Sequence, residues 1–385
     1  MKTIFLLCSI VVGLSLSAQN IGIGTTSPAS SAKLEINSTN SGLLIPRMST
    51  TQRNAIASPA AGLLIFNTDN NSLEMWNSTS WLSFGSAGVL NNGVPVGPSC
   101  NGTWSQKLDF GGTGRTAATG FSIGSKGYFG TGYDGANRKD FWEFDPASNT
   151  WTQKADFGGS ARSAAFGFAI GNKGYLGTGY DGNYVKDFWE YDPANNTWTK
   201  KADFGGVGRN GASVFVAGSK GYAGMGNDGI SDVVDFWEYD PTANSWSLET
   251  NFPGPPRSGA VGFAIGSKGY FGTGQSIVGS YKKDFWEYDP TTNAWTQKTD
   301  FPGVSRTGCL GFAIGTKGYI GAGSNGGAAR KDFWEYDPLT NTWIQKADFG
   351  GTGRTYSISL VVSNKAYVGS GNDGTYRKDF WEYCQ

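Results

Sequence analysis

The chain has 385 residues, of which 38% are hydrophobic, so it can bury a large core, and its 59 glycines without a Gly-X-Y period predict many tight turns and an all-β fold. Lys+Arg and Asp+Glu number 31 each, so the net charge is zero, and no basic run offers the surface that nucleic-acid binding requires. The absence of histidine excludes histidine general bases, catalytic triads and imidazole metal ligands.

Residues 1–18 have the pattern of a cleaved secretory signal peptide. Lys2 is followed by an uncharged apolar run from Ile4 to Leu16 and then by Ser17 and Ala18. The run is shorter than the roughly 20 residues that span a bilayer. We therefore expect an exported protein, either extracellular or at the cell surface, with the periplasm as the alternative. No later segment reaches 18 consecutive apolar residues, so no membrane-spanning segment is expected in the mature protein.

Residues 19–88 form a separate module, rich in Ser, Thr, Asn and Ala. Strands are predicted at Gly62–Asn67, Leu73–Trp76 and Trp81–Phe84, the first two joined by a turn. The segments Ile21–Pro28 and Gly42–Met48 resemble N-terminal regions of bacterial surface proteins and phage tail-fibre-like shafts. This resemblance implies self-association into a stalk. The alternative is a flexible spacer with a small β subdomain. Residues 89–99, rich in Gly, Asn and Pro, are predicted to be a linker.

From residue 100 to residue 385 the chain consists of a repeat. The stretch Asp140–Pro146 recurs in six near copies, spaced 47 to 49 residues apart, which is the spacing of propeller blades. The tryptophans of these copies are Trp142, Trp189, Trp237, Trp286, Trp334 and Trp381.

One period, from Arg162 to Phe204, predicts four strands. An inner strand of small and apolar residues ends at Ile170, and a second strand ends in the glycines around Thr178. The third strand, Asp187–Asp192, carries adjacent aromatic residues that must point to opposite faces, so both faces are expected to be covered. Thr197–Lys201 is predicted to be the outer strand. Four strands per period of about 48 residues indicate a propeller blade.

These motifs resemble the Kelch repeat of the galactose oxidase-like superfamily. The pattern, complete in the copy that begins at Arg162, is Arg at the head, Lys-Gly-Tyr before Gly-x-Gly, an Asp-Gly pair, then Trp-Glu-Tyr-Asp-Pro and Asn-Thr-Trp, and the other copies vary at single positions. The resemblance covers residues 102–383 and implies a six-bladed β-propeller. The paired glycines of the family appear here as Gly130-Thr131-Gly132, and the fourth copy has Gln275-Ser276 in place of Asp-Gly.

The phase of the repeat predicts how the ring closes. An outer strand at Trp104 has no inner strands before it, and the inner strands after Arg354 have no outer strand after them. These halves are expected to combine into the sixth blade, which leaves no open edge. Alignment of the copies places Cys100 and Cys384 on either side of the turn that this blade lacks, so a disulfide is predicted between them.

Candidate binding residues lie on the face that carries the longer loops between the second and third strands. Six arginines begin the inner strands there: Arg115, Arg162, Arg209, Arg257, Arg306 and Arg354. They could bind a carboxylate or a sugar acid, or each could pair with a carboxylate such as Asp140 or Glu143 and lock the blades together, which is the interpretation that repeated identity favours. The loops add further candidates at their first residues: Tyr133, Tyr180, Asn227, Gln275 and Asn372.

Neither a metal nor a cofactor is expected. The Asp-Gly loops offer one carboxylate each, too few for a calcium site, and a galactose oxidase copper site needs histidine. The expected function is recognition of a glycan or protein ligand through the loop face. A sugar isomerase such as a sialic-acid mutarotase and a structural surface-display protein are the alternatives, and the evenness of the copies argues against an enzyme.

Overall fold

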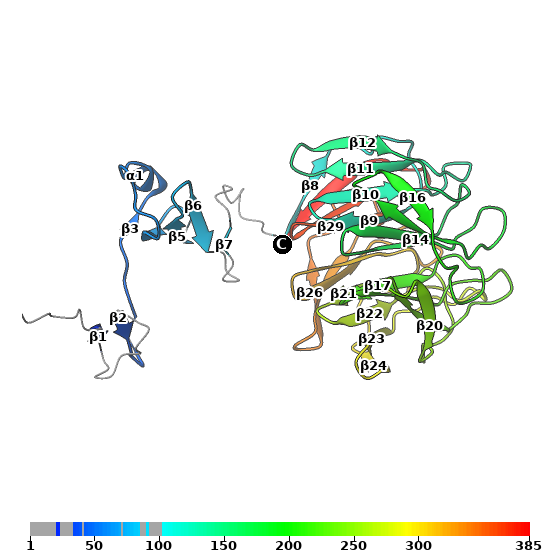
Figure 1. The fold of residues 1–385 in the computed structure, drawn as a ribbon. Coiled ribbons are helices and arrows are strands. Elements are labelled where there is room, and N and C mark those ends of the chain that lie inside the picture. Colours follow the sequence, from blue (N-terminus) through cyan, green and yellow to red (C-terminus); the bar gives the residue numbers. More distant parts are fainter. Residues whose placement is uncertain (1–20, 24–33, 41, 71, 85–89, 92–101) are drawn as a thin grey trace, which may run out of the picture. The chain divides into compact units, whose positions relative to one another are not determined.

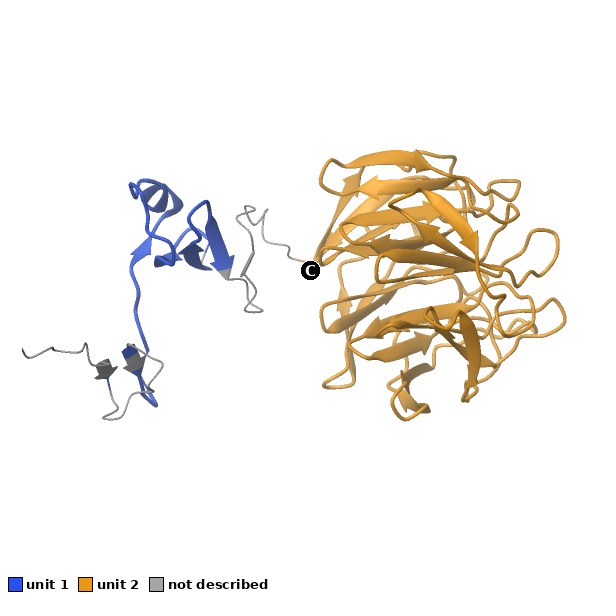
Figure 2. Ribbon diagram, viewed as in Figure 1, with its two compact units in different colours: residues 1–99 blue, residues 100–385 orange. Residues whose placement is uncertain are grey.

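The computed structural model describes residues 21–23, 34–40, 42–70, 72–84, 90–91 and 102–385, which belong to two units, residues 1–99 and 100–385 (Figure 2). The predicted signal peptide lies outside the described residues. Among the residues that are described, no helix is long and apolar enough to cross a membrane.

The N-terminal unit is built from short strands. A parallel pair, β1 (Ile21–Ile23) and β2 (Leu34–Ile36), is followed by a five-stranded sheet in the order β3-β4-β5-β6-β7. The predicted hairpin and third strand are confirmed as the middle of this sheet. Its strands are β3 (Arg47–Met48), β4 (Leu64–Asn67), β5 (Ser72–Trp76), β6 (Trp81–Phe84) and β7 (Leu90–Asn91).

Two features of this unit differ from the sequence-based expectation. The helix α1 (Thr50–Asn54) was not predicted, although Ser49 and Gln52 form a capping box at its start. The strand β7 lies inside the segment predicted to be a linker. There Leu90 pairs with Phe84 and adds a short edge strand to the sheet. A two-residue strand is too short to have a periodicity signal of its own.

The interior of the small sheet contains a buried carboxylate. Glu74 is fully buried, and its carboxylate accepts hydrogen bonds from Arg53 at 2.7 Å, Asn70 at 2.9 Å and Asn67 at 3.1 Å. Burial raises the pKa of Glu74, but these hydrogen bonds outweigh it and the net shift of the pKa is downward. The polar cluster therefore joins α1 to β4 and β5 in a module with little apolar core.

The C-terminal unit consists of six four-stranded antiparallel sheets (Figure 1). The inner strands β9, β13, β17, β21, β25 and β29 contact one another in sequence, and β29 contacts β9, so the sheets form a closed ring. The predicted strands are confirmed, with bounds that differ by a few residues.

The first three blades contain β9 (Thr119–Ile123), β10 (Lys126–Gly130), β11 (Phe141–Asp145), β12 (Thr150–Lys154); β13 (Phe166–Ile170), β14 (Lys173–Gly177), β15 (Phe188–Asp192), β16 (Thr197–Lys200); and β17 (Ser213–Ala217), β18 (Lys220–Gly224), β19 (Phe236–Asp240), β20 (Ser245–Glu249). The last three contain β21 (Val261–Ile265), β22 (Lys268–Gly272), β23 (Phe285–Asp289), β24 (Ala294–Lys298); β25 (Leu310–Ile314), β26 (Lys317–Gly321), β27 (Phe333–Asp337), β28 (Thr342–Lys346); and β29 (Ile358–Val362), β30 (Lys365–Gly369), β31 (Phe380–Cys384), β8 (Thr103–Lys107).

The predicted closure of the ring is confirmed. The sixth sheet has the order β29-β30-β31-β8, so the first strand of the repeat region completes the last blade, with Tyr383 opposite Trp104. Cys384 pairs with Thr103, and the amide of Gly102 donates to the carbonyl of Cys384 at 3.0 Å. Cys100 lies outside the described residues, so its disulfide with Cys384 stays a prediction.

The core between blades is aromatic. Phe188 is fully buried, and its ring packs edge-on against Tyr239 and Trp246 of the next blade at centroid distances of 4.8 and 5.1 Å. Its neighbour Trp189 points to the other face and meets Phe157 at 6.0 Å. The predicted two-faced burial of the third strand is thus confirmed, and the recurring motif is a packing layer between blades.

Candidate ligand-binding site

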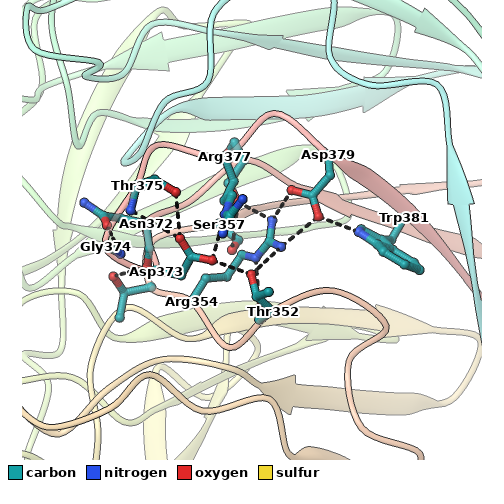
Figure 3. Close-up of polar contacts among 12 residues, drawn as sticks. Thr352, Arg354, Ser357, Asn372, Asp373, Gly374, Thr375, Arg377, Asp379 and Trp381 are labelled. Carbon is teal, nitrogen blue, oxygen red and sulfur yellow. Dashed lines mark hydrogen bonds and ion pairs between the residues drawn. The ribbon is translucent and has the colours of Figure 1, made fainter.

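Each blade contains one buried arginine that ties its inner strand to its third strand, as Figure 3 shows for the last blade. The two terminal nitrogens of Arg354 donate to the two carboxylate oxygens of Asp379 at 2.5 and 2.8 Å. Arg354 also donates to the carbonyls of Thr352 and Ser370, and Asp379 accepts from the indole of Trp381 at 2.7 Å. The guanidinium lies 5.1 Å from the ring centre of Phe349.

The same unit is repeated in every blade. The ion pairs are Arg115–Asp140, Arg162–Asp187, Arg209–Asp235, Arg257–Asp284, Arg306–Asp332 and Arg354–Asp379, with side chains of arginine that are 0 or 1% exposed. These arginines therefore present no free cation to a ligand, and the expectation that they bind one is not supported by their burial. The predicted pairing with a carboxylate is confirmed, with Asp140 as the partner. Each pair joins two strands of the same blade, so these pairs lock each blade internally and not, as predicted, one blade to another. Glu143 instead accepts from Tyr128 at 2.8 Å.

The aspartates of these pairs are held in the charged form. Burial raises the pKa of Asp140, but the bonds from Arg115 and Trp142 outweigh it, and the net pKa lies below the ordinary value of 3.8. The aspartates of the other five blades have lowered pKa values through the same balance. They are fixed anions with no free proton to exchange near neutral pH.

The longer loops connect to one another around the face. Asn137 of the first blade donates to the carbonyl of Tyr180 in the second, Asp232 of the third accepts from the amide of Ile277 in the fourth, and Tyr376 of the last packs edge-on against Tyr133 of the first. The carboxylate of Asp134, at a loop tip, accepts hydrogen bonds from Thr113 and Arg138 of the same blade. Among the described residues, no cluster of three or more metal-ligating side chains is present.

The loop residues predicted to bind have different environments. Tyr133 and Tyr180 are each 38% exposed. Asn227 and Asn372 are half-buried, and each accepts from the backbone amide of a glycine two residues later, so they shape their own turns. Gln275 is half-buried and pairs through its backbone with Ser258. Of these five residues, Tyr133 alone lines the axial cavity described below.

A ring of backbone hydrogen bonds surrounds the propeller axis on this face. The six bonds, from 2.8 to 3.1 Å long, each join one blade to its neighbour, and each residue of the ring lies two positions after a buried arginine. All six have a left-handed backbone, with φ between 49° and 62°. The ring residues are Ala117, Ala164, Gly211, Gly259, Gly308 and Tyr356.

A cavity of about 310 Å³ lies at the propeller axis, and residues of this ring form part of its lining. Most of its lining comes from the starts of the inner strands, and all of the side chains that line it are uncharged. The lining residues are Thr116, Ala117, Tyr133, Ser163, Ala164, Asn210, Gly211, Ser258, Gly259 and Tyr356. Hydroxyl, amide and phenol groups converge there with two aromatic rings, a combination typical of a small-molecule site.

Two further kinds of cavity are present. Cavities of about 550 and 480 Å³ lie at the arginine pairs of Arg115 and Arg306, and both are lined by a further Arg-Lys pair of the loop, Arg138-Lys139 and Arg330-Lys331. A groove of about 420 Å³ in the N-terminal unit is lined mainly by apolar side chains: Leu43, Leu44, Ile45, Arg47, Leu64, Phe66 and Leu73.

A closed ring of six four-stranded sheets, each with one arginine unit, makes the C-terminal unit a β-propeller. Residues 179–205 match the Kelch motif, and residues 22–97 match the phage tail like trimerisation region. A solved structure described as "Structure of YjhT" is similar, with a TM-score of 0.61 and 18% sequence identity over 71% of this chain and 94% of that chain. No curated protein matches the chain.

This similarity establishes the fold alone. Matching solved structures number 824 chains, and a fold so widely used does not select a function. The axial ring and Tyr356 were not found by sequence reasoning. The available signal was the residue two positions after each arginine, which is Ala or Gly in five copies and Tyr in the sixth.

Proposed function

We propose that this protein is an exported recognition protein whose propeller binds a glycan or protein ligand in the axial cavity of the loop face. The observation that carries the proposal is the uncharged lining of that cavity, with side-chain hydroxyl and amide groups of Ser163, Asn210 and Ser258 beside Tyr133 and Tyr356. Such groups can exchange hydrogen bonds with ligand hydroxyls, while the aromatic rings cover apolar ligand surface.

The cavity favours an uncharged ligand over a sugar acid. The cations nearest to the inner strands, such as Arg162, are already bonded through both terminal nitrogens to aspartate. A mutarotase acting on sialic acid would need a partner for the substrate carboxylate and an acid or base at the ring oxygen. The cavity lining supplies neither a cation nor a carboxylate, so recognition is the better-supported function.

The N-terminal unit is proposed to join copies of the chain. Leu43 and Leu44 are 67 and 80% exposed beside the apolar groove, and a second copy would cover them. The match to a trimerisation region supports three copies. Three propellers on one stalk would bind a repeating surface with avidity well above the affinity of one site.

The experiment is a glycan array probed with the full chain, followed by titration calorimetry on the ligands found and a mutarotation assay on sialic acid. We expect binding of uncharged glycans and no turnover. Ser163→Trp should fill the cavity and abolish binding. Its control is Thr291→Trp, an exposed position in the turn between β23 and β24. Turnover of sialic acid, or equal binding by both variants, would overturn the proposal.

A further inference from the structure

Tyr356 departs from the repeat at the axial ring. The equivalent positions in the other five blades are alanine or glycine, and every ring residue has a left-handed backbone. Tyr356 has φ of 53°, a conformation that is unfavourable for a residue with a side chain. The ring requires this φ in every blade, so the departure at Tyr356 is the bulky side chain and not the backbone.

The phenol ring of Tyr356 extends across the neighbouring blades. A methyl group placed on Gly308 would lie 3.1 Å from two ring carbons of Tyr356, and one placed on Gly259 would lie 3.3 Å from a third ring carbon and 3.4 Å from the phenol oxygen. The ring therefore lies close against the backbone of both glycines. It also lines the axial cavity and is 39% exposed, so part of the aromatic surface remains open to a ligand.

We propose that Tyr356 is the specificity-determining residue of the cavity: an aromatic platform on which the apolar face of one uncharged sugar ring stacks. This inference rests on the proposed function. Gly259 and Gly308 let the phenol ring lie against their backbone, since a side chain at either position would press on the ring. Around it, Ser163, Asn210 and Ser258 lie where they can bond the sugar hydroxyls.

The size of the cavity limits what can stack there. About 310 Å³ is at the lower end of the range for small-molecule sites, so the cavity admits the end of a glycan and not a long segment of it. An uncharged terminal sugar is the chemistry that this site would recognise.

The test compares Tyr356→Phe and Tyr356→Gly in the full chain, titrated with an uncharged glycan found on the array. Tyr356→Phe keeps the ring and should bind within about threefold of the unmodified protein. Tyr356→Gly removes the platform and should lose affinity on the order of tenfold. It should remain folded, because three other blades carry glycine at this position with φ near 62°. Thermal melting checks the fold of each variant.

Tyr184→Ala is the matched control, because Tyr184 is 36% exposed in a loop of the same face and does not line the cavity. We expect it to bind as the unmodified protein does. Undiminished binding by Tyr356→Gly would overturn the platform, and so would an equal loss of affinity in Tyr184→Ala or Tyr356→Phe. If the unmodified protein binds no uncharged glycan, the glycan form of the proposed function fails together with this inference.

Discussion

At the scale of single residues, the arginine of each blade is a buried side chain that bonds several groups of its own blade. Arg209 is fully buried and makes two hydrogen bonds to Asp235, at 2.6 and 2.7 Å, besides bonds to the carbonyls of Val207 and Met225. A buried ion pair adds little to stability by itself, because both charges lose their hydration. Removing one partner of such a pair is costly, because it leaves the other charge buried without a counter-charge. Removal of Arg209 leaves the two carbonyls without these donors and leaves the Asp235 carboxylate with the indole of Trp237 but no counter-charge.

We therefore expect Arg209→Ala to lower the free energy of unfolding by about 3–5 kcal/mol, because the half-buried Asp235 loses its counter-charge. The control is Lys220→Ala, which breaks a pair with Asp240 whose side chains are 32 and 31% exposed and should cost less than about 1 kcal/mol. Urea denaturation measures both. Equal losses would contradict the structural role assigned to the arginine.

The same aspartates predict how stability depends on pH. Their pKa values in the folded protein lie below the ordinary value of 3.8, so the stability they contribute is fully present above about pH 4 and is lost as the pH falls through the folded values. Because the chain has no histidine, no group with an ordinary pKa near 6.5 titrates between pH 5 and 8. Thermal melting should show a flat midpoint across that range and a steep decline below pH 4. A transition near pH 6 would contradict this expectation.

At the scale of elements, β8 determines whether the propeller is a closed ring or an open one. Its five residues pair along the whole of β31, from Lys107 opposite Phe380 to Thr103 opposite Cys384. Without β8, the edge of β31 would expose unpaired backbone groups. The predicted disulfide between Cys100 and Cys384 would fasten this strand at the end where the other blades have a turn.

Cys100→Ser should lower the free energy of unfolding by roughly 2–5 kcal/mol, since the disulfide closes a loop that includes nearly the whole propeller. Adding a reductant to the unmodified protein should have the same effect and should not change the variant further. Cys309→Ser is the control, because Cys309 is a free thiol. Non-reducing peptide mapping that found Cys100 and Cys384 as thiols would end the proposal.

At the scale of the whole molecule, the two units differ in how much of their apolar surface they bury. The propeller is held together by its own aromatic layers and its closing strand, whereas the N-terminal unit exposes Leu43, Leu44 and an apolar groove. Small sheets bury too little surface to be stable in isolation, so association between copies would complete the core that one copy lacks.

The match to a trimerisation region predicts an oligomer of three copies. Leu44→Asp should shift the full chain from this oligomer toward the monomer. A charge in the covered apolar face is costly, since its burial leaves the carboxylate unpaired. Leu339→Asp is the control, because Leu339 is 88% exposed in a turn of the propeller and should have no effect. Light scattering after size-exclusion chromatography measures the mass. A monomeric unmodified protein would contradict the proposal.

The sequence by itself determined the propeller, its four-stranded blades and their closure by the strand at Trp104, because these follow from a repeat period, from alternation along strands and from phase. It also identified the six arginines but could not choose between Asp140 and Glu143 as partner, since spacing along the chain does not fix which carboxylate faces the guanidinium. Only the tertiary structure decided that choice. It alone brought six residues from six blades into one hydrogen-bonded ring and laid Tyr356 across Gly259 and Gly308, because residues 47 or more positions apart in the chain meet only when the blades pack around one axis.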